Sequence, residues 1–230
     1  VPRLLLDPNT WAKDGATALD AWQPSDDGKY LLYSVQDGGS DWRMLRVLDV
    51  RTGEQMADEV RWAKFTNLAW VGSEGFLYSR FPAPAEGTAF QGLNYNQALY
   101  FHRLGTAQEE DEQVYATPEH PEYGHSAQVT QDGRYALITS TISTDARYEV
   151  RTIDLKRRGR AGWVVKPLVN GFENDWRLVE GLGRKLWFVT NWKAPRYRLI
   201  GIDLAERTPK WRELIAERED ILEKGDIVGD

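Results

Sequence analysis

The stretch "SDDGKYLLYS" at residues 25–34 returns in nearly the same form as "TQDGRYALIT" at 130–139. Two looser versions are present, "GSEGFLYS" at 72–79 and "GLGRKLWFVT" at 181–190. Each joins a turn signal to a short run of aromatic and aliphatic residues, which is typical of a β-hairpin. Because glycine supplies the positive φ that tight turns need, we predict four hairpins that turn at Gly28, Gly75, Gly133 and Gly183.

Flanking segments extend each hairpin into a four-stranded unit. A short apolar run precedes each turn, and an alternating run follows the hairpin: "WRMLRVLDV" at 42–50, "QALYFHRL" at 97–104, "YEVRTIDL" at 148–155 and "YRLIGIDL" at 197–204. Alternation of polar and apolar residues predicts half-buried strands. The turn glycines are 47, 58 and 50 residues apart. Four strands in about 50 residues is the pattern of a β-propeller blade.

The repeat therefore predicts an all-β fold, a partial β-propeller of about four four-stranded antiparallel blades. We place the blades near residues 15–58, 59–117, 118–170 and 171–217, with partial blades at both ends. The first half of "WRELIAEREDILEK" (211–224) is interpreted as an outer strand, although its apolar spacing also suits a helical turn.

Composition narrows the function classes. The chain has 230 residues, of which 41% are hydrophobic and 28% charged, and no apolar run is long enough to span a membrane. The start, "VPRLLLDPNT", lacks the features of a signal peptide, so we expect it to lie inside a longer protein. A net charge of −6 argues against a nucleic-acid partner, and the basic run at 156–160 is predicted to be a solvated turn. No cysteine is present, which leaves the cytoplasm and the periplasm both open.

Strand parity brings one set of connections to the same end of the blades. In strand order A to D, the B–C and D–A connections share an end, and they are the longer, aromatic-bearing ones: 36–41, 57–67, 81–96, 118–125, 140–147, 170–176 and 191–196. Long loops on a rigid scaffold commonly carry function, so we expect the partner here. Trp62, Trp176 and Trp192 fall in or beside these connections. The strand tryptophans are predicted to fill the space between blades: Trp22, Trp42, Trp70, Trp187 and Trp211.

Within the chain no motif predicts catalysis, a metal site or a cofactor. There is no G-x-S-x-G nucleophile elbow, and the three histidines show no zinc-ligand spacing. His102 alternates within a strand and is predicted to be a surface residue. His120 and His125 sit in a D–A connection, where either a plain loop role or a ligand contact is open.

Several segments resemble the early propeller of prolyl oligopeptidases. They are "LLLDPNTWAKDGATALDAWQPSDDGKYLLYSVQDGGSDWRMLRVLDVRTG", "VRWAKFTNLAW", "YFHRLGT", "QDGRYALIT" and "NWKAPRYRLIGIDL", and the resemblance runs in order over essentially the whole chain. It implies a serine peptidase that cleaves short peptides after proline. In that family a seven-bladed propeller caps an α/β-hydrolase domain that holds the catalytic triad; the hydrolase domain and about three blades are absent from this sequence.

The resemblance also implies roles for individual residues. Phe65 in "AKFTN" matches a phenylalanine that lines the pocket for the third residue before the cut. Asp41 in "GSDW" matches an acid that faces the hydrolase domain, near an arginine that binds substrate. Thr141 and Thr144 stand where some relatives have Arg and Cys at the pocket edge, and Gly124 stands where some have Met, beside Tyr123 and His125. We therefore take Tyr123, His125, Thr141 and Thr144 as candidate substrate-binding residues.

Two other interpretations are open. The chain could be a stand-alone propeller that serves as a protein-interaction scaffold, or part of a sister oligopeptidase that prefers basic residues. A downstream nucleophile elbow in the parent sequence would favour an enzyme, and a stop codon after the propeller would favour the scaffold.

Overall fold

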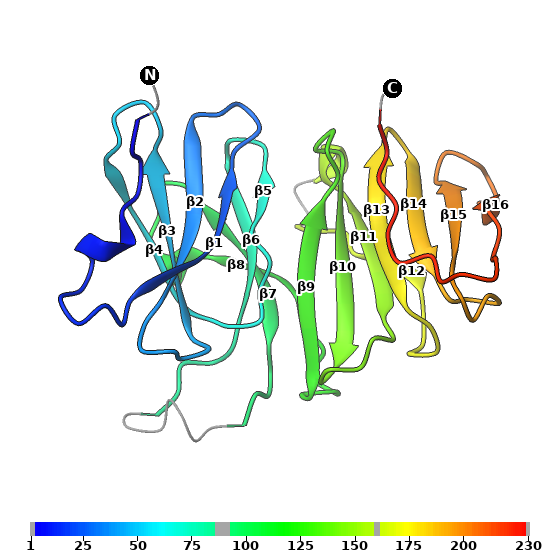
Figure 1. The fold of residues 1–230 in the computed structure, drawn as a ribbon, viewed down its shortest axis with the longest axis horizontal. Helices are drawn as coiled ribbons and strands as arrows, with labels where there is room; N and C mark the ends of the chain where they lie inside the picture. The colour runs from blue at the N-terminus through cyan, green and yellow to red at the C-terminus, as the bar shows by residue number, and fades with distance from the viewer. Residues whose placement is uncertain (1–2, 86–92, 159–161, 229–230) are drawn as a thin grey trace. The chain divides into compact units, whose positions relative to one another are not determined.

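The computed structural model describes residues 3–85, 93–158 and 162–228, and in these ranges the fold is all-β (Figure 1). Antiparallel strands form the sheets, and the helical elements are single 3-10 turns: η1 (Pro8–Thr10), η2 (Gln108–Glu110) and η3 (Leu155–Arg157). No helix among the described residues is long and apolar enough to cross a membrane. The prediction of an all-β fold with antiparallel sheets is confirmed.

The chain divides into two compact units, residues 1–128 and 129–230. The first unit holds one sheet in the order β1-β2-β3-β4-β6-β7-β8, with β5 paired to β6. Its strands are β1 (Ala18–Pro24), β2 (Tyr30–Gln36), β3 (Arg43–Asp49), β4 (Gln55–Ala63), β5 (Ala69–Val71), β6 (Gly75–Arg80), β7 (Ala98–Arg103) and β8 (Glu112–Tyr115).

Two further four-stranded sheets follow, in the orders β12-β11-β10-β9 and β13-β14-β15-β16. Their strands are β9 (Tyr123–Val129), β10 (Tyr135–Ile142), β11 (Glu149–Asp154), β12 (Lys166–Val169), β13 (Trp176–Leu182), β14 (Lys185–Thr190), β15 (Arg198–Asp203) and β16 (Arg212–Ile215). The short strand β16 confirms the strand interpretation of the first half of 211–224, and the second half of that segment forms no helix.

The first quoted stretch builds a self-contained turn. The Ser25 hydroxyl donates to the Asp27 carboxylate at 2.8 Å and accepts from the Tyr30 amide at 3.0 Å. The amide of Lys29 donates to the same Asp27 oxygen, and Gly28 turns the chain at φ +69°. Short polar side chains that bond to nearby backbone favour turns over strands. The motif therefore specifies its hairpin from partners within six residues.

The second stretch repeats the same bonds. Thr130 donates to Asp132 at 2.8 Å and accepts from the Tyr135 amide at 3.0 Å. The Arg134 amide donates to Asp132, and Gly133 has a φ of +65°. Threonine thus replaces serine without loss of any contact, which explains why the two sequences are nearly alike.

Each of these aspartates also bonds to the turn of the following repeat. The second oxygen of Asp27 accepts from the Ser73 hydroxyl at 2.8 Å, and that of Asp132 accepts from the Gly183 amide at 2.7 Å. The aspartate consequently closes its own turn and links it to the turn about 50 residues later.

The predicted turn at Gly75 is wrong. Gly75 is the first residue of β6, pairs with Arg103, and lacks a positive φ; Gly72, at φ +55°, turns the chain instead. One backbone bond that recurs in all four repeats fixes the correct alignment: Val50 to Lys29, Leu104 to Glu74, Leu155 to Arg134 and Leu204 to Arg184. Gly75 therefore occupies the position of Tyr30, where a Cβ would lie 2.0 Å from the His102 carbonyl oxygen.

Apolar residues from these strands form separate cores in the two units. The first unit packs around Leu32, Leu45, Val47, Val60, Trp70, Phe76 and Tyr78. The second packs around Tyr135, Leu137, Val150, Trp176, Leu186, Phe188, Ile200 and Ile202. Trp70 and Trp176 fill these cores, but Trp22 does not, because 60% of its surface is exposed in β1. The packing role predicted for Trp22 is wrong in this structure.

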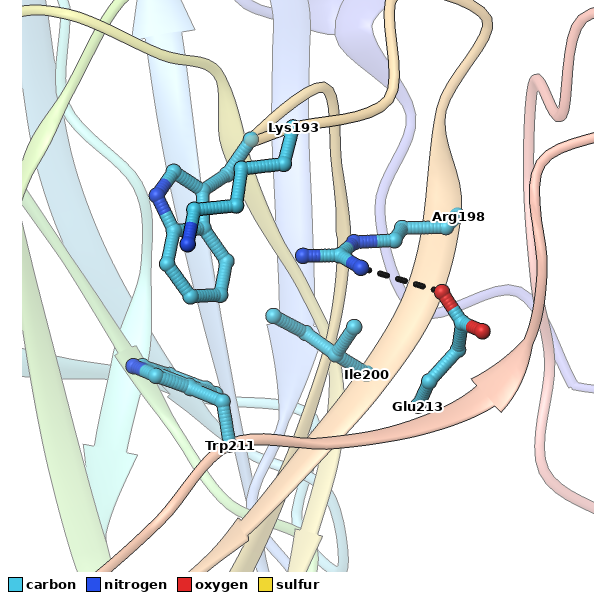
Figure 2. A pocket seen from close by; sticks show the side chains of 6 residues that line it. Lys193, Arg198, Ile200, Trp211 and Glu213 are labelled. Carbon is cyan, nitrogen blue, oxygen red and sulfur yellow. Dashed lines mark hydrogen bonds and ion pairs between the residues drawn. The ribbon is translucent and has the colours of Figure 1, made fainter.

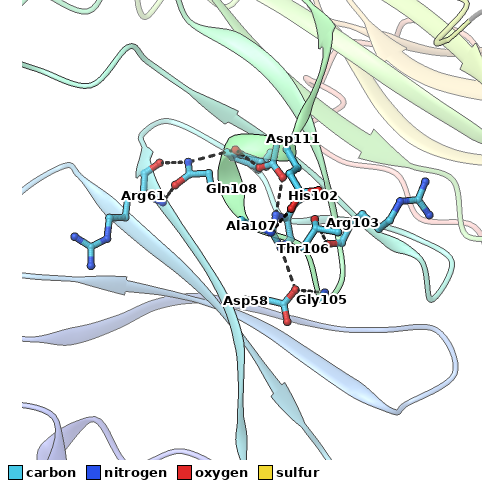
Figure 3. Close-up of polar contacts among 11 residues, drawn as sticks. Asp58, Arg61, His102, Arg103, Gly105, Thr106, Ala107, Gln108 and Asp111 are labelled. Carbon is cyan, nitrogen blue, oxygen red and sulfur yellow. Dashed lines mark hydrogen bonds and ion pairs between the residues drawn. The ribbon is translucent and has the colours of Figure 1, made fainter.

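His102, predicted to lie on the surface, is wholly buried. Figure 3 shows its contacts with Asp58 and Asp111. Its Nδ1 lies 2.7 Å from Asp111 and its Nε2 lies 3.0 Å from Asp58. Tyr78 donates its hydroxyl hydrogen to the second oxygen of Asp111 at 2.6 Å, and the Gly105 amide donates to Asp58 at 2.6 Å. Burial alone would lower the pKa of His102, but the two carboxylates outweigh it and raise that pKa to about 9. A charged histidine thus occupies a buried position of the first unit, next to the buried Phe101.

Candidate functional site

The candidate site of the first unit begins where β4 ends. The connection predicted at 57–67 is shorter than expected, because β4 continues to Ala63. Trp62, inside the strand, has a φ of +63° and coincides with a shift in the β3–β4 register, so the strand bulges there. The bulge precedes Lys64 and Phe65, the two residues that leave the strand.

Lys64 joins the two residues for which the sequence predicted a role. Its Nζ lies 3.7 Å from the Asp41 carboxylate and 5.1 Å from the centre of the Phe65 ring. The same ammonium lies 5.0 Å from the centre of Trp42. The Lys64 side chain is only 12% exposed, whereas that of Asp41 is 61% exposed. A shielded cation between aromatic faces is a favourable arrangement, and here it brings Asp41 and Phe65 together.

The two rings that face this lysine, Trp42 and Phe65, are linked to further aromatic rings by edge-to-face contacts. Trp42 meets Trp62 at 5.6 Å and Phe81 at 6.3 Å between ring centres, and Phe81 meets Phe65 at 6.5 Å. Such geometry is the preferred one for aromatic pairs. We refer to Asp41, Trp42, Trp62, Lys64, Phe65 and Phe81 as the Phe65 cluster.

Phe65 is exposed and strained at the same time. Its surface is 60% exposed, and its φ of +52° lies in the left-handed region, which is uncommon for a residue with a large side chain. A backbone outlier of this kind costs on the order of 1–3 kcal/mol and persists only where its surroundings impose it. An exposed apolar ring contributes little to folding through its own burial.

Gln97 forms hydrogen bonds with the backbone on both sides of the Phe65 Cα. Its side-chain amide donates to the Lys64 carbonyl at 2.7 Å and to the Phe65 carbonyl at 3.4 Å. Its carbonyl oxygen accepts from the His125 amide at 2.6 Å. The Thr66 hydroxyl, next along the chain, accepts from the Ser79 amide at 2.7 Å. The loop after β4 is thus tied to β6 and to the residue that precedes β7.

His125 supports the site and is itself 2% exposed. Its Nε2 lies 3.1 Å from the Thr117 hydroxyl, and its ring packs edge-on against Tyr115 at 5.0 Å. Tyr123, two residues earlier in β9, is half-buried and stacks on His120 at 4.5 Å. The structure therefore connects His125 to Phe65 through Gln97.

Thr141 and Thr144 belong to the second unit. Thr141 is half-buried near the end of β10, and Thr144 is exposed in the turn that follows. A hollow of about 300 Å³ also lies in this unit (Figure 2). It is lined by Trp192, Lys193, Arg198, Ile200, Trp211 and Glu213. Arg198 stacks on Trp192 and is paired with Glu213 at 3.0 Å, and the Lys193 ammonium lies 4.7 Å from the centre of the Trp192 ring.

The family model for the N-terminal β-propeller domain of prolyl oligopeptidase matches residues 2–229. The chain belongs to the prolyl oligopeptidase family. It is 31% identical to the prolyl endopeptidase of Elizabethkingia meningoseptica over 221 residues, which cover 96% of this chain and 31% of that protein. It is 32% identical to the dual function macrocyclase-peptidase of Galerina marginata over 232 residues, 94% of this chain and 31% of that protein.

Solved prolyl oligopeptidase structures agree with the sequence comparison. A prolyl endopeptidase studied for the role of inter-domain dynamics in catalysis and specificity superposes with a TM-score of 0.89 at 45% identity, covering 99% of this chain and 31% of that one. Prolyl oligopeptidase B of Galerina marginata, bound to a 35mer hydrolysis and macrocyclization substrate, superposes with a TM-score of 0.85 at 31% identity. The match covers 93% of this chain and 31% of that one. The chain spans about a third of the length of these relatives, and the predicted resemblance is confirmed.

Sequence reasoning missed Lys64 and Gln97. Lys64 adjoins Phe65 in the quoted "AKFTN", but nothing in its spacing shows that an ammonium would be shielded by aromatic rings. Gln97 stands directly before an alternating strand, where a polar residue is usually exposed, and it is 2% exposed. The one signal for Gln97 is its place between a long connection and a strand, which many surface residues share.

Proposed function

We propose that this chain is the propeller segment of a serine oligopeptidase that cleaves short peptides after proline. In the full-length protein it would cap an α/β-hydrolase domain, restrict access to the catalytic site and line part of the substrate pocket. Membership of the prolyl oligopeptidase family supports this proposal, as does a relative solved with a peptide substrate bound. The observation that carries it here is the exposed, strained Phe65 beside Asp41.

In this proposal Phe65 and Asp41 act by different physics. Phe65 contacts an apolar side chain of the peptide, three residues before the cut. Asp41, whose carboxylate is 61% exposed on the propeller side, pairs with a cation of the hydrolase domain. Tyr123 would contribute a polar group beside Phe65, with His125 as internal support, and Thr141 and Thr144 would be peptide contacts of the second unit.

The test uses the full-length peptidase and two lengths of proline-containing peptide. Loss of the Phe65 ring removes about 1–3 kcal/mol of apolar contact, so Phe65→Ala should lower kcat/KM roughly 5- to 150-fold for peptides with a bulky apolar third residue. Shorter peptides should be unaffected. Asp41→Ala should weaken every substrate, because an unpaired charge is left at a closed interface.

Trp22 provides the matched control, since it is an aromatic residue of the first unit with the same 60% exposure outside the Phe65 cluster. Trp22→Ala should change neither substrate. If Phe65→Ala affects long and short peptides equally, or behaves like Trp22→Ala, Phe65 is not a substrate contact. A parent protein with no peptidase activity would favour the interaction scaffold.

A further inference from the structure

We propose that Gln97 is a positioning residue that sets the conformation of Phe65 and, through it, the selectivity for the peptide's third residue before the cut. This inference rests on the function proposed above. Gln97 lies immediately before β7 and touches no surface that a peptide could reach, because it is 2% exposed. Its effect on substrate must therefore pass through the groups that it holds.

Gln97 uses both halves of its side-chain amide. The nitrogen donates to the carbonyls of Lys64 and Phe65, at 2.7 and 3.4 Å, and the oxygen accepts from the His125 amide at 2.6 Å. These bonds fix the amide orientation, because a flipped amide would put its oxygen against two carbonyl oxygens. A buried polar group that is matched in this way is expensive to disturb.

The two bonded carbonyls define the backbone of Phe65. The Lys64 carbonyl belongs to the peptide plane before the Phe65 Cα, and the Phe65 carbonyl belongs to the plane after it. One amide that holds both planes consequently fixes φ and ψ of the residue between them. Without this clamp, the ordinary right-handed or extended conformation is lower in energy for a phenylalanine than φ +52°. Relaxation would rotate a peptide plane and move the ring out of its place beside Phe81 and Lys64.

The substitution Gln97→Glu isolates the donor function. A glutamate keeps the length and the acceptor for the His125 amide, but it places an oxygen where the two carbonyls need a donor. Gln97→Met serves as a second variant of similar length that brings no charge. Gln108→Glu is the matched control. Gln108 holds the backbone of Arg61 in β4, the strand that leads to Phe65: it donates to the Arg61 carbonyl at 2.9 Å and accepts from the Arg61 amide at 3.0 Å.

The first measurement reports on conformation alone. In full-length protein with 4-fluorophenylalanine incorporated at position 65, the fluorine resonance should be single and should shift or split in Gln97→Glu and in Gln97→Met. It should stay in place in Gln108→Glu. An unchanged resonance in both Gln97 variants overturns the inference, whatever the kinetics show.

The second measurement is kinetic. Gln97→Glu should raise KM about tenfold for long peptides with a bulky apolar third residue, keep kcat within about twofold, and leave short peptides unchanged. Added to Phe65→Ala, it should have an effect below about twofold, since the two changes act on one contact. A full additional loss in that background would overturn the inference. If the resonance moves while Phe65→Ala has no kinetic effect, the positioning role stands and the proposed function fails.

Discussion

Raising the pH from 6 to 10 should remove about 3 kcal/mol from the unfolding free energy of the first unit, and His102 should be the group responsible. Its ring is wholly buried, with a carboxylate within 3.0 Å of each nitrogen. Both nitrogens must donate to make these contacts, so the charged form is the one that fits. Deprotonation would leave one carboxylate without its donor in a buried site.

The size of the effect comes from the difference in pKa between the folded and unfolded states. The pKa of His102 is raised from 6.5 to about 9, and each pKa unit corresponds to about 1.4 kcal/mol. A group whose pKa is higher in the folded state contributes its full stabilisation below the unfolded pKa. That stabilisation should therefore be constant below pH 6.5 and decline up to pH 9. Burial raises the pKa of Asp58, but the hydrogen bonds from His102 and Gly105 outweigh it and lower that pKa. The stabilisation from Asp58 is therefore lost as the pH falls, and only below about pH 4.

Urea unfolding of the full-length protein, followed by tryptophan fluorescence, measures this difference. Wild type and His102→Gln are compared at each pH, so that the other titrating groups cancel. The difference in unfolding free energy between wild type and His102→Gln should decrease by about 3 kcal/mol from pH 6 to pH 10. His120→Gln, at an exposed histidine 3.7 Å from Glu122, serves as the control and should follow wild type. If this difference in unfolding free energy stays constant from pH 6 to pH 10, His102 is not charged with both ring nitrogens donating.

Substitutions at Gly75, Gly72 and Asp132 test the structure of the repeats. Gly75→Ala should destabilise the protein by more than about 3 kcal/mol, because its Cβ would meet a backbone oxygen at 2.0 Å. Gly72→Ala, in open space at φ +55°, should cost only about 1 kcal/mol. Equal effects of the two substitutions in thermal melts would contradict the observed strand pairing. Asp132→Ala should lower the unfolding free energy by about 1–2 kcal/mol, because it removes the hydrogen bonds within its own turn and the one to Gly183. Asp132→Asn should cause a smaller loss. An Asp132→Ala variant as stable as wild type would show that the aspartate does not link successive repeats.

The repeated turns could be predicted from the sequence because their interactions are local. Ser25, Asp27 and Tyr30 find one another within six residues, so the motif carries its own geometry. The prediction is wrong where the motif is least regular: "GSEGFLYS" contains two glycines, and the one predicted to turn the chain aligns with Tyr30 and not with Gly28. Only the position of the backbone bond from Leu104 to Glu74 resolves that choice.

Partners distant in sequence explain why His102 was misplaced. Strict alternation along β7 assigns neighbouring residues to opposite faces, one buried and one exposed. In the structure Phe101 and His102 are both buried, so both faces of this strand are covered. Asp58, which pairs with His102, lies 44 residues away, and no periodicity connects them. A charged residue in a core is recognised by its partners and not by its position in a pattern.

The same limit applies to Phe65, but the consequence there is functional. A sequence motif can mark the residue, yet it cannot show that the chain holds a large ring in a left-handed conformation at a cost in stability. Folding alone would favour burying that ring or relaxing its backbone. Instead a buried glutamine holds the backbone, and a shielded lysine faces the ring, which is 60% exposed. Local choices that oppose stability are expected where a surface is shaped for a ligand, and the left-handed backbone of Phe65 fits the substrate contact proposed for it.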